Sequence, residues 1–177
     1  MDNAALEQLA EQLAQALQQR GWSLATAESC TGGWVGQTMT AIAGSSEWFE
    51  RGFVTYSNIA KQEMLGVTAE TLARHGAVSE QTVREMAAGA LQHSHTHVSL
   101  AISGVAGPTG GSASRPVGTV WLAWASPEKV IAQVYHFSGN REQVRYASVQ
   151  AALQGLHDLI VSGQLGCFNP HSTSSAK

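Results

Sequence analysis

Apolar residues recur at helical spacing at the beginning of the chain. Leucines and alanines stand three or four positions apart between residues 4 and 20, with Glu and Gln between them. This spacing places the apolar side chains on one face of a helix, and Gly21 follows where glycine commonly ends a helix. The pattern predicts an amphipathic helix over residues 4–20.

Short apolar runs then alternate with helical patterns. The run 23–27 is typical of a buried strand, and a helix that starts at Thr31 and ends near residue 43 is expected after it. β-branched and aromatic residues at 52–56 indicate another strand, and Ser57 or Asn58 can cap the next helix. The first half of the chain therefore repeats a strand-to-helix unit.

The second half has a different order of elements. Helices are predicted at 68–75 and from Ser79 onward, where hydroxyl side chains can cap them. Three strands and a long final helix follow, at 97–103, 117–126, 129–137 and about 141–161. The four residues from Ser126 to Lys129 suit a hairpin, which makes the last two strands antiparallel.

This order of elements predicts an α/β fold, a three-layer α/β/α sandwich around a mixed, mostly parallel sheet. A length of 177 residues without a change in composition indicates a single domain, residues 1–162. Beyond Gly163 the sequence turns to Gly, Asn, Pro, Ser and Thr, so residues 163–177 are expected to be a disordered tail.

Composition and charge narrow the class of partner. Hydrophobic residues make up 44% of the chain and charged residues only 13%, which favours an apolar patch covered by another subunit in a homo-oligomer, preferentially a dimer. A net charge of −3 without a basic block argues against nucleic acid and favours a small-molecule substrate. No signal peptide or apolar run of roughly 20 residues is present, so we expect no membrane partner and a cytoplasmic location.

The segment after the first predicted strand carries the strongest candidate chemistry. Ligands of α/β sheets bind beyond the carboxyl ends of strands, where Ser29, Thr31, Gly32 and Gly33 fall. Glycine N–H groups at a helix N-terminus can bind a phosphate or an oxyanion, and the hydroxyls can supply a nucleophile. The alternative is that Ser29 or Thr31 merely caps the helix.

A serine nucleophile needs a base, and no histidine lies in the neighbouring segments. Lys61 is the best candidate, because it follows Tyr56 and Asn58 in the first turn of a predicted helix. The positive end of the helix dipole disfavours an ammonium there and favours neutral lysine, the form that accepts a proton. The competing interpretation is a solvated surface lysine.

Two further segments suit ligand binding. The loop 103–111 has too many glycines for a simple turn and could wrap a ligand or close over it, although it could equally be a flexible connection. Arg141 and Arg145 lie one helical turn apart, so both guanidinium groups can face one anion. Surface ion pairs are the alternative for these two arginines.

The histidines and the first cysteine suggest less. His93, His95 and His97 alternate on an extended segment without nearby carboxylates or thiolates, which makes a poor set of metal ligands. Cys30 has no adjacent histidine-containing motif, so we expect a small buried side chain there and not a nucleophile. No metal site is predicted.

Four motifs follow one another along the chain: Thr26–Gly33, Gly52–Asn58 with Lys61, Gly76–Ser79, and Ser103–Pro108 with Gly110, Gly111 and Pro116–Val120. Over about residues 5–160, these ordered motifs closely resemble the CinA C-terminal domain family. Stand-alone members of this family include amidohydrolases that convert nicotinamide mononucleotide (NMN) to nicotinate mononucleotide and ammonia in pyridine nucleotide salvage. The resemblance therefore implies an amidohydrolase of this type.

The resemblance also implies roles for individual residues. Hydrolysis would need neither metal nor cofactor: Ser29 attacks the carboxamide carbon, Lys61 is the base and proton shuttle, and Tyr56 assists with position or polarity. Backbone N–H groups near Thr31 to Gly33, or at Gly104, would hold the oxyanion, and Arg141 and Arg145 the phosphate. The predicted substrate-binding residues are Thr31, Gly32, Gly33, Ser46, Asn58, Gly104, Gly107, Arg141 and Arg145.

Two other functions stay open on sequence grounds. The chain could be a catalytically silent paralogue that binds a nucleotide and regulates another protein, because the same hydroxyls and glycines would serve a binding module. It could also be an amidase for a different nucleotide or small amide.

Overall fold

A five-stranded mixed sheet forms the centre of the computed structural model, which describes residues 3–166. In spatial order the strands are β2 (Phe49–Val54), β1 (Leu24–Glu28), β3 (Val98–Gly104), β4 (Thr119–Ala125) and β5 (Val130–His136). β2, β1 and β3 are parallel, whereas β4 is antiparallel to both β3 and β5. The carboxyl ends of β1, β2 and β3 therefore meet at the same end of the sheet.

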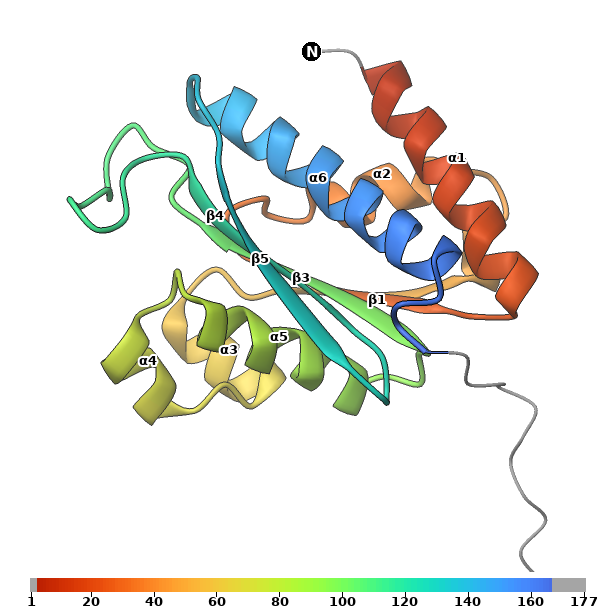
Figure 1. The fold of residues 1–177 in the computed structure, drawn as a ribbon, viewed down its shortest axis with the longest axis horizontal. Coiled ribbons are helices and arrows are strands. Elements are labelled where there is room, and N and C mark those ends of the chain that lie inside the picture. Colours follow the sequence, from red (N-terminus) through yellow and green to blue (C-terminus); the bar gives the residue numbers. More distant parts are fainter. Residues whose placement is uncertain (1–2, 167–177) are drawn as a thin grey trace, which may run out of the picture.

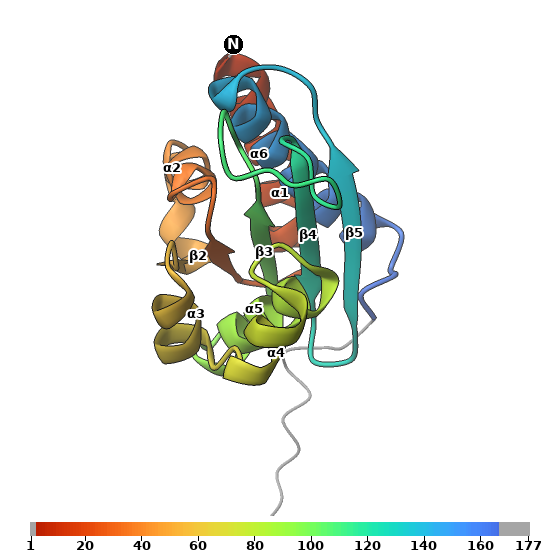
Figure 2. The same ribbon diagram turned by 90° about the vertical axis from the view of Figure 1, so that its left-hand side faces the viewer.

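Helices cover both faces of this sheet, as Figures 1 and 2 show. One face carries α1 (Asn3–Arg20), α2 (Trp34–Thr40) and α6 (Arg141–Val161). The other face carries α3 (Asn58–Leu65), α4 (Ala69–His75) and α5 (Glu80–Gln92). The predicted three-layer α/β/α sandwich with a mixed sheet is thus confirmed.

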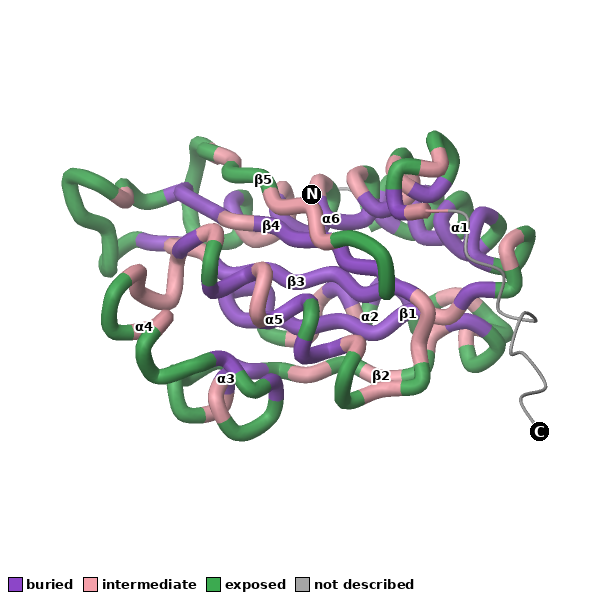
Figure 3. The backbone as a smooth tube through the Cα atoms, turned by 60° about the horizontal axis from the view of Figure 1, so that its bottom comes forward, coloured by how far each residue is buried: buried purple, intermediate pink, exposed green. Residues whose placement is uncertain are grey.

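The two faces of the central strands differ in side-chain size. Toward α1 and α6 the strands present large apolar residues such as Leu100 and Leu122. Toward α5 they present mainly alanines, including Ala25, Ala101 and Ala123. The two kinds of side chain alternate because successive residues of a strand point to opposite faces. Since helices cover both faces, β1, β3 and β4 are buried along nearly their whole length (Figure 3).

The predicted elements are present, and the largest differences in their boundaries concern β2 and α2. The strand predicted at 52–56 is β2, which begins at Phe49 and ends at Val54, because it pairs in parallel with β1 over that stretch. The helix expected from Thr31 begins only at Trp34. Gly32 and Gly33 have φ values of +63° and +95°, which are outside the helical region and leave these residues in a turn.

The end of the domain extends beyond the predicted boundary. β4 and β5 form the expected hairpin, in which the N–H groups of Ser126 and Lys129 each donate to the other residue's carbonyl oxygen. The Oγ of Ser126 also donates to the carbonyl oxygen of Leu165, at 2.6 Å, and Leu165 is fully buried. Residues 163–166 therefore belong to the folded domain, and the remainder of the predicted tail, 167–177, lies outside the described residues.

Among the described helices, none is long and apolar enough to cross a membrane.

Candidate active site

A pocket of about 230 Å³ opens where the loops after β1, β2 and β3 meet. The first loop contributes Ser29, the second contributes Tyr56, and the end of β3 contributes Gly104. This is the end of the sheet at which parallel α/β folds bind their ligands. The complete lining is Ser29, Cys30, Tyr56, Asn58, Lys61, Ala77, Val78, Ser103, Gly104, Ala106 and Arg141.

Ser29 and Lys61 are in direct contact in this pocket. The Nζ of Lys61 donates a hydrogen bond of 3.1 Å to the Oγ of Ser29 and one of 2.8 Å to the carbonyl oxygen of Thr55. Lys61 is only 1% exposed, and burial lowers the pKa of its amine from the ordinary value of 10.5. The predicted surface alternative for Lys61 is therefore wrong: this lysine is buried beside a serine hydroxyl.

The helix α3 holds Lys61 in this position. The Oγ of Ser57 caps the helix by accepting from the N–H of Ala60, and Lys61 lies in the first turn, as predicted. Its N–H donates to the carbonyl oxygen of Ser57. The positive end of the helix dipole and the burial of the amine both favour the neutral form of Lys61.

A buried carboxylate organises the loop that carries Ser29. Glu28 is 1% exposed and accepts four hydrogen bonds: from the hydroxyl of Thr31 at 2.7 Å and from three backbone N–H groups at 2.9–3.1 Å. Those N–H groups belong to Gly33, which directly precedes α2, and to Val35 and Gly36 in its first turn. Because Gly33 offers no side-chain cap, the carboxylate of Glu28 caps α2 instead.

This arrangement changes the predicted role of the glycines. The N–H of Gly33 is bonded to Glu28, and the N–H of Gly32 donates to the carbonyl oxygen of Ser29 at 3.0 Å. The hydroxyl of Thr31 is also occupied by Glu28, and Thr31 is fully buried. In the described structure the protein's own groups therefore already accept from these two N–H groups and this hydroxyl.

Tyr56 and Arg141 form the rim of the pocket. One terminal nitrogen of the Arg141 guanidinium donates to the phenol oxygen of Tyr56 at 2.9 Å, and the other donates to the carbonyl oxygen of Gly107 at 2.8 Å. Arg141 thereby ties the start of α6 to the loops after β2 and β3. The side chain of Tyr56 is mostly exposed, so its hydroxyl is accessible from the pocket mouth.

A second and larger pocket, of about 660 Å³, adjoins the first through Arg141. Its lining includes both predicted arginines, Arg141 and Arg145, and the turn residues Gly32 and Gly33. The Nε of Arg145 donates to the carbonyl oxygen of Cys30 at 3.0 Å, and one terminal nitrogen donates to that of Thr31 at 2.8 Å. The surface ion-pair alternative does not describe Arg145, whose partners are backbone carbonyls.

Most of the predicted site residues gather at these two pockets, whereas Ser46 does not. Ser46 is exposed in the short 3₁₀ helix η1 (Ser45–Glu47), which precedes β2. Because β2 is parallel to β1, the start of β2 and the end of β1 lie at opposite ends of the sheet. Ser46 is therefore remote from Ser29 in this chain, and it lines neither of the two pockets.

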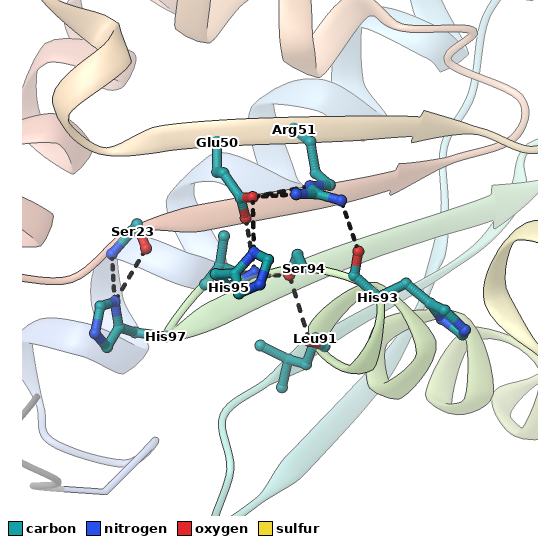
Figure 4. A network of polar contacts seen from close by, with 9 residues as sticks. Ser23, Glu50, Arg51, Leu91, His93, Ser94, His95 and His97 are labelled. Atoms are coloured by element: carbon teal, nitrogen blue, oxygen red, sulfur yellow. Dashed lines mark hydrogen bonds and ion pairs between the residues drawn. The ribbon is translucent and has the colours of Figure 1, made fainter. Parts of the chain in front are cut away.

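The histidine run lies at that opposite end as well (Figure 4). The Nδ1 of His93 faces the carbonyl oxygen of Gly89, that of His97 accepts from the N–H of Ser23, and His95 lies beside Glu50. The three rings therefore have separate partners. Within residues 3–166, no cluster of three or more His, Cys, Asp and Glu side chains could hold a metal ion.

Cys30 is buried beside Ser29, and burial raises the pKa of its thiol to about 11. A thiol with such a pKa is almost entirely protonated near neutral pH and is a weak nucleophile. The structure thus agrees with the expectation of a small buried side chain. Of the adjacent Ser29 and Cys30, only Ser29 has a hydrogen bond to Lys61.

Sequence reasoning missed two buried residues of the site. Glu28 was visible only as an acidic residue at the end of an apolar strand, and such a buried carboxylate must find donors inside the protein. Ser103 donates from its Oγ to the carbonyl oxygen of Ala77 at 2.7 Å, which fixes the wall of the pocket formed by Ala77 and Val78. No periodicity in the sequence indicated that contact.

A buried serine–lysine pair beyond the carboxyl ends of parallel strands defines a class of α/β protein equipped for nucleophilic catalysis without histidine. The chain belongs to the CinA C-terminal domain family, whose model matches residues 6–160.

Two relatives and one solved structure illustrate the similarity. The chain is 56% identical over 157 residues to the nicotinamide-nucleotide amidohydrolase PncC of Escherichia coli strain K12, which covers 88% of this chain and 95% of the relative. It is 47% identical over 151 residues to the protein of the same name from Pseudomonas putida, covering 85% and 94%. A crystal structure of a CinA superfamily protein from Klebsiella pneumoniae superposes with a TM-score of 0.86 at 41% identity, covering 89% of this chain and 98% of that one.

Proposed function

We propose that this chain is a nicotinamide-nucleotide amidase that hydrolyses the carboxamide of NMN to nicotinate mononucleotide and ammonia by a serine nucleophile and a lysine base. The observation that carries the proposal is the 3.1 Å hydrogen bond between the Oγ of Ser29 and the buried Nζ of Lys61. Similarity over most of the chain to amidohydrolases named for nicotinamide nucleotides supports the choice of substrate.

In the first half of the reaction, the Oγ of Ser29 attacks the carboxamide carbon while neutral Lys61 takes the hydroxyl proton. The carbonyl oxygen becomes an oxyanion in the tetrahedral intermediate. Lys61 then gives its proton to the nitrogen as the C–N bond breaks, so ammonia leaves and a Ser29 ester of the nicotinoyl group remains. The depressed pKa of Lys61 suits both transfers.

In the second half, a water molecule attacks the ester carbon and Lys61 takes its proton. When the C–O bond to Ser29 breaks, Lys61 returns this proton to the Oγ, and nicotinate mononucleotide is released. The cycle restores Ser29 and Lys61 without any net redox change. It uses no metal and no cofactor, because the lysine both accepts and donates the proton.

The two adjoining pockets suggest how a nucleotide lies in the site. Pockets for drug-sized ligands measure roughly 300–1,000 Å³, so the pocket of about 230 Å³ suits the pyridine ring and its amide. The ribose and phosphate would extend past Arg141 into the larger pocket, where Arg141 can bind the phosphate. Asn58, Gly104 and Gly107 would flank the ring.

The test is ammonia release from NMN by the purified chain, with and without a chelator such as EDTA. We expect the same rate in both conditions. Loss of the activity on chelation would contradict the metal-independent mechanism. No release from NMN in either condition would favour the silent nucleotide-binding paralogue, whose affinity for NMN can be measured by calorimetry, or an amidase for another substrate.

The pH dependence of the reaction follows from Lys61. Below its pKa the ammonium cannot accept the serine proton, so kcat/KM for NMN should rise with pH and level off once Lys61 is neutral. The apparent pKa of this acidic limb is expected below 10.5, because burial lowers it. Initial rates between about pH 6 and pH 10 measure the profile, and a rate that falls as pH rises through this limb would contradict a lysine base.

Replacement of Arg141 by Gln should weaken recognition of the phosphate. Charge-assisted hydrogen bonds contribute about 1.5–3 kcal/mol, so kcat/KM for NMN is expected to fall roughly 10- to 100-fold. The kcat/KM for nicotinamide riboside, which has no phosphate, should fall much less. Arg74→Gln is the matched control, because Arg74 lies on the exposed surface of α4 and pairs only with Glu70 in the described structure. Equal losses for both substrates would remove Arg141 from phosphate binding.

The homo-oligomeric state and the cytoplasmic location stay predictions from composition.

A further inference from the structure

The guanidinium of Arg145 binds the backbone of the turn that carries Ser29, residues 29–33. Its Nε and one terminal nitrogen donate to the consecutive carbonyl oxygens of Cys30 and Thr31, across more than a hundred residues of sequence. Arg145 also lies over the ring of Trp34, 5.2 Å from its centroid. Contacts from two sides thus hold the guanidinium in one orientation.

These contacts determine how the peptide groups of the turn are oriented. In a trans peptide the C=O and the N–H point in opposite directions. By holding the carbonyl of Thr31, Arg145 therefore fixes the N–H of Gly32, which donates to the carbonyl oxygen of Ser29 at 3.0 Å. The bond from Gly32 in turn fixes the peptide group between Ser29 and Cys30. The N–H of this peptide group belongs to Cys30 and points away from the bonded carbonyl oxygen of Ser29.

The N–H of Cys30 is the group best suited to meet a developing oxyanion. It belongs to the residue directly after the nucleophile, and Cys30 lines the same pocket as Ser29. In the part of the chain that the structure describes, this N–H donates to no other residue; the acceptor beside it is the sulfur of Cys30 itself, which is a weak acceptor. The N–H groups of Gly32 and Gly33, by contrast, are already bonded.

We propose that Arg145 is a positioning residue for the proposed amide hydrolysis: through the carbonyls of Cys30 and Thr31 it orients the peptide whose Cys30 N–H binds the oxyanion. The inference rests on the proposed function, and it assigns to Arg145 a task other than phosphate binding. Two of the three nitrogens of this guanidinium already donate to backbone carbonyls within the described residues.

The experiment compares Arg145→Lys with the wild-type enzyme on NMN and on nicotinamide riboside. Lysine keeps the positive charge but cannot bridge two carbonyls as a guanidinium does. We expect kcat to fall by roughly 10- to 100-fold, which is a smaller loss than deletion of an oxyanion donor causes. KM should stay nearly unchanged, and kcat should fall by the same factor for both substrates. A loss restricted to NMN, or one confined to KM, would overturn the proposal in favour of phosphate binding.

Chemical rescue separates positioning from general damage to the fold. Arg145→Ala should be less active still, and millimolar guanidinium should restore part of its kcat while equal concentrations of ammonium should not. Thermal melts of both variants check that the domain stays folded. If guanidinium restores nothing in a folded Arg145→Ala protein, the proposal is wrong. Arg74→Ala, on the surface of α4, is the control expected to behave as wild type.

A substrate-independent readout distinguishes this proposal from the proposed function. An arylsulfonyl fluoride modifies a reactive serine by forming an O–S bond and releasing fluoride, and intact mass measures the rate at Ser29. Slower modification of Arg145→Lys supports positioning even if the wild type does not hydrolyse NMN. Equal rates in wild type and variant, or no reaction of the wild type with either NMN or the fluoride, would overturn the proposal.

Discussion

Replacing Ser29 by alanine is expected to reduce kcat for ammonia release from NMN by roughly 10⁴-fold or more, because the reaction loses its nucleophile. Lys61→Met should be similarly severe, since the serine hydroxyl is a poor nucleophile without a base. The buried contact between the two side chains makes them one unit. The double variant should therefore be hardly worse than either single one.

Initial rates of ammonia formation measure all three variants, with two controls chosen from the same residue types. Ser162→Ala should keep wild-type activity, because Ser162 is exposed at the C-terminal end of α6, whereas the pocket adjoins the start of that helix. Lys129→Met, in the exposed β4–β5 hairpin, should do the same. Full activity in Ser29→Ala would remove Ser29 as the nucleophile, and additive losses in the double variant would mean that Ser29 and Lys61 act separately.

Replacing Glu28 by glutamine should damage both stability and catalysis. The carboxylate accepts hydrogen bonds from one hydroxyl and three N–H groups. A glutamine amide has the same shape, but its NH₂ group would face at least one of these donors and leave it buried without an acceptor. The free energy of unfolding should fall by about 2–4 kcal/mol, and kcat should fall because the turn that carries Ser29 loosens.

Urea unfolding followed by circular dichroism gives the stability of the Glu28→Gln protein. Kinetics with NMN give its activity. Glu63→Gln is the matched control, because Glu63 is exposed on α3 and the same change there removes no buried acceptor. A Glu28→Gln protein that is as stable and active as wild type would show that the carboxylate does not organise the turn.

The long helices and the hairpin could be predicted because their signals are local. The final helix spans Arg141–Val161 as expected, and Asn140 and Gln143 form a capping box at its start. The start of β2 could not be placed in the same way. Its first residues, from Phe49 on, become a strand by pairing with β1, and such pairing depends on a neighbour that is distant in sequence.

Part of the site was predictable for the same reason. Ser29 was indicated because it follows a predicted strand and precedes glycines, and Lys61 because it lies in the first turn of a predicted helix. The start of that helix near Ser57 indicated an environment unfavourable for an ammonium. The burial of Lys61 and its contact with Ser29 arise only when β1 and β2 lie side by side. The distance between Ser46 and the pocket could not be predicted, because proximity in sequence to β2 does not reveal which end of the strand faces the pocket.

The sequence by itself thus determined the helices, the strand pattern and the residues capable of the chemistry, because periodicity, capping and side-chain type are properties of short segments. Only the tertiary structure decided which donors and acceptors are already taken. Glu28 accepts from the N–H of Gly33, and the carbonyl of Ser29 accepts from that of Gly32. Arg145, in α6, donates to the carbonyls of the same turn. Those contacts depend on how the sheet and its two helical layers pack, which no short segment encodes.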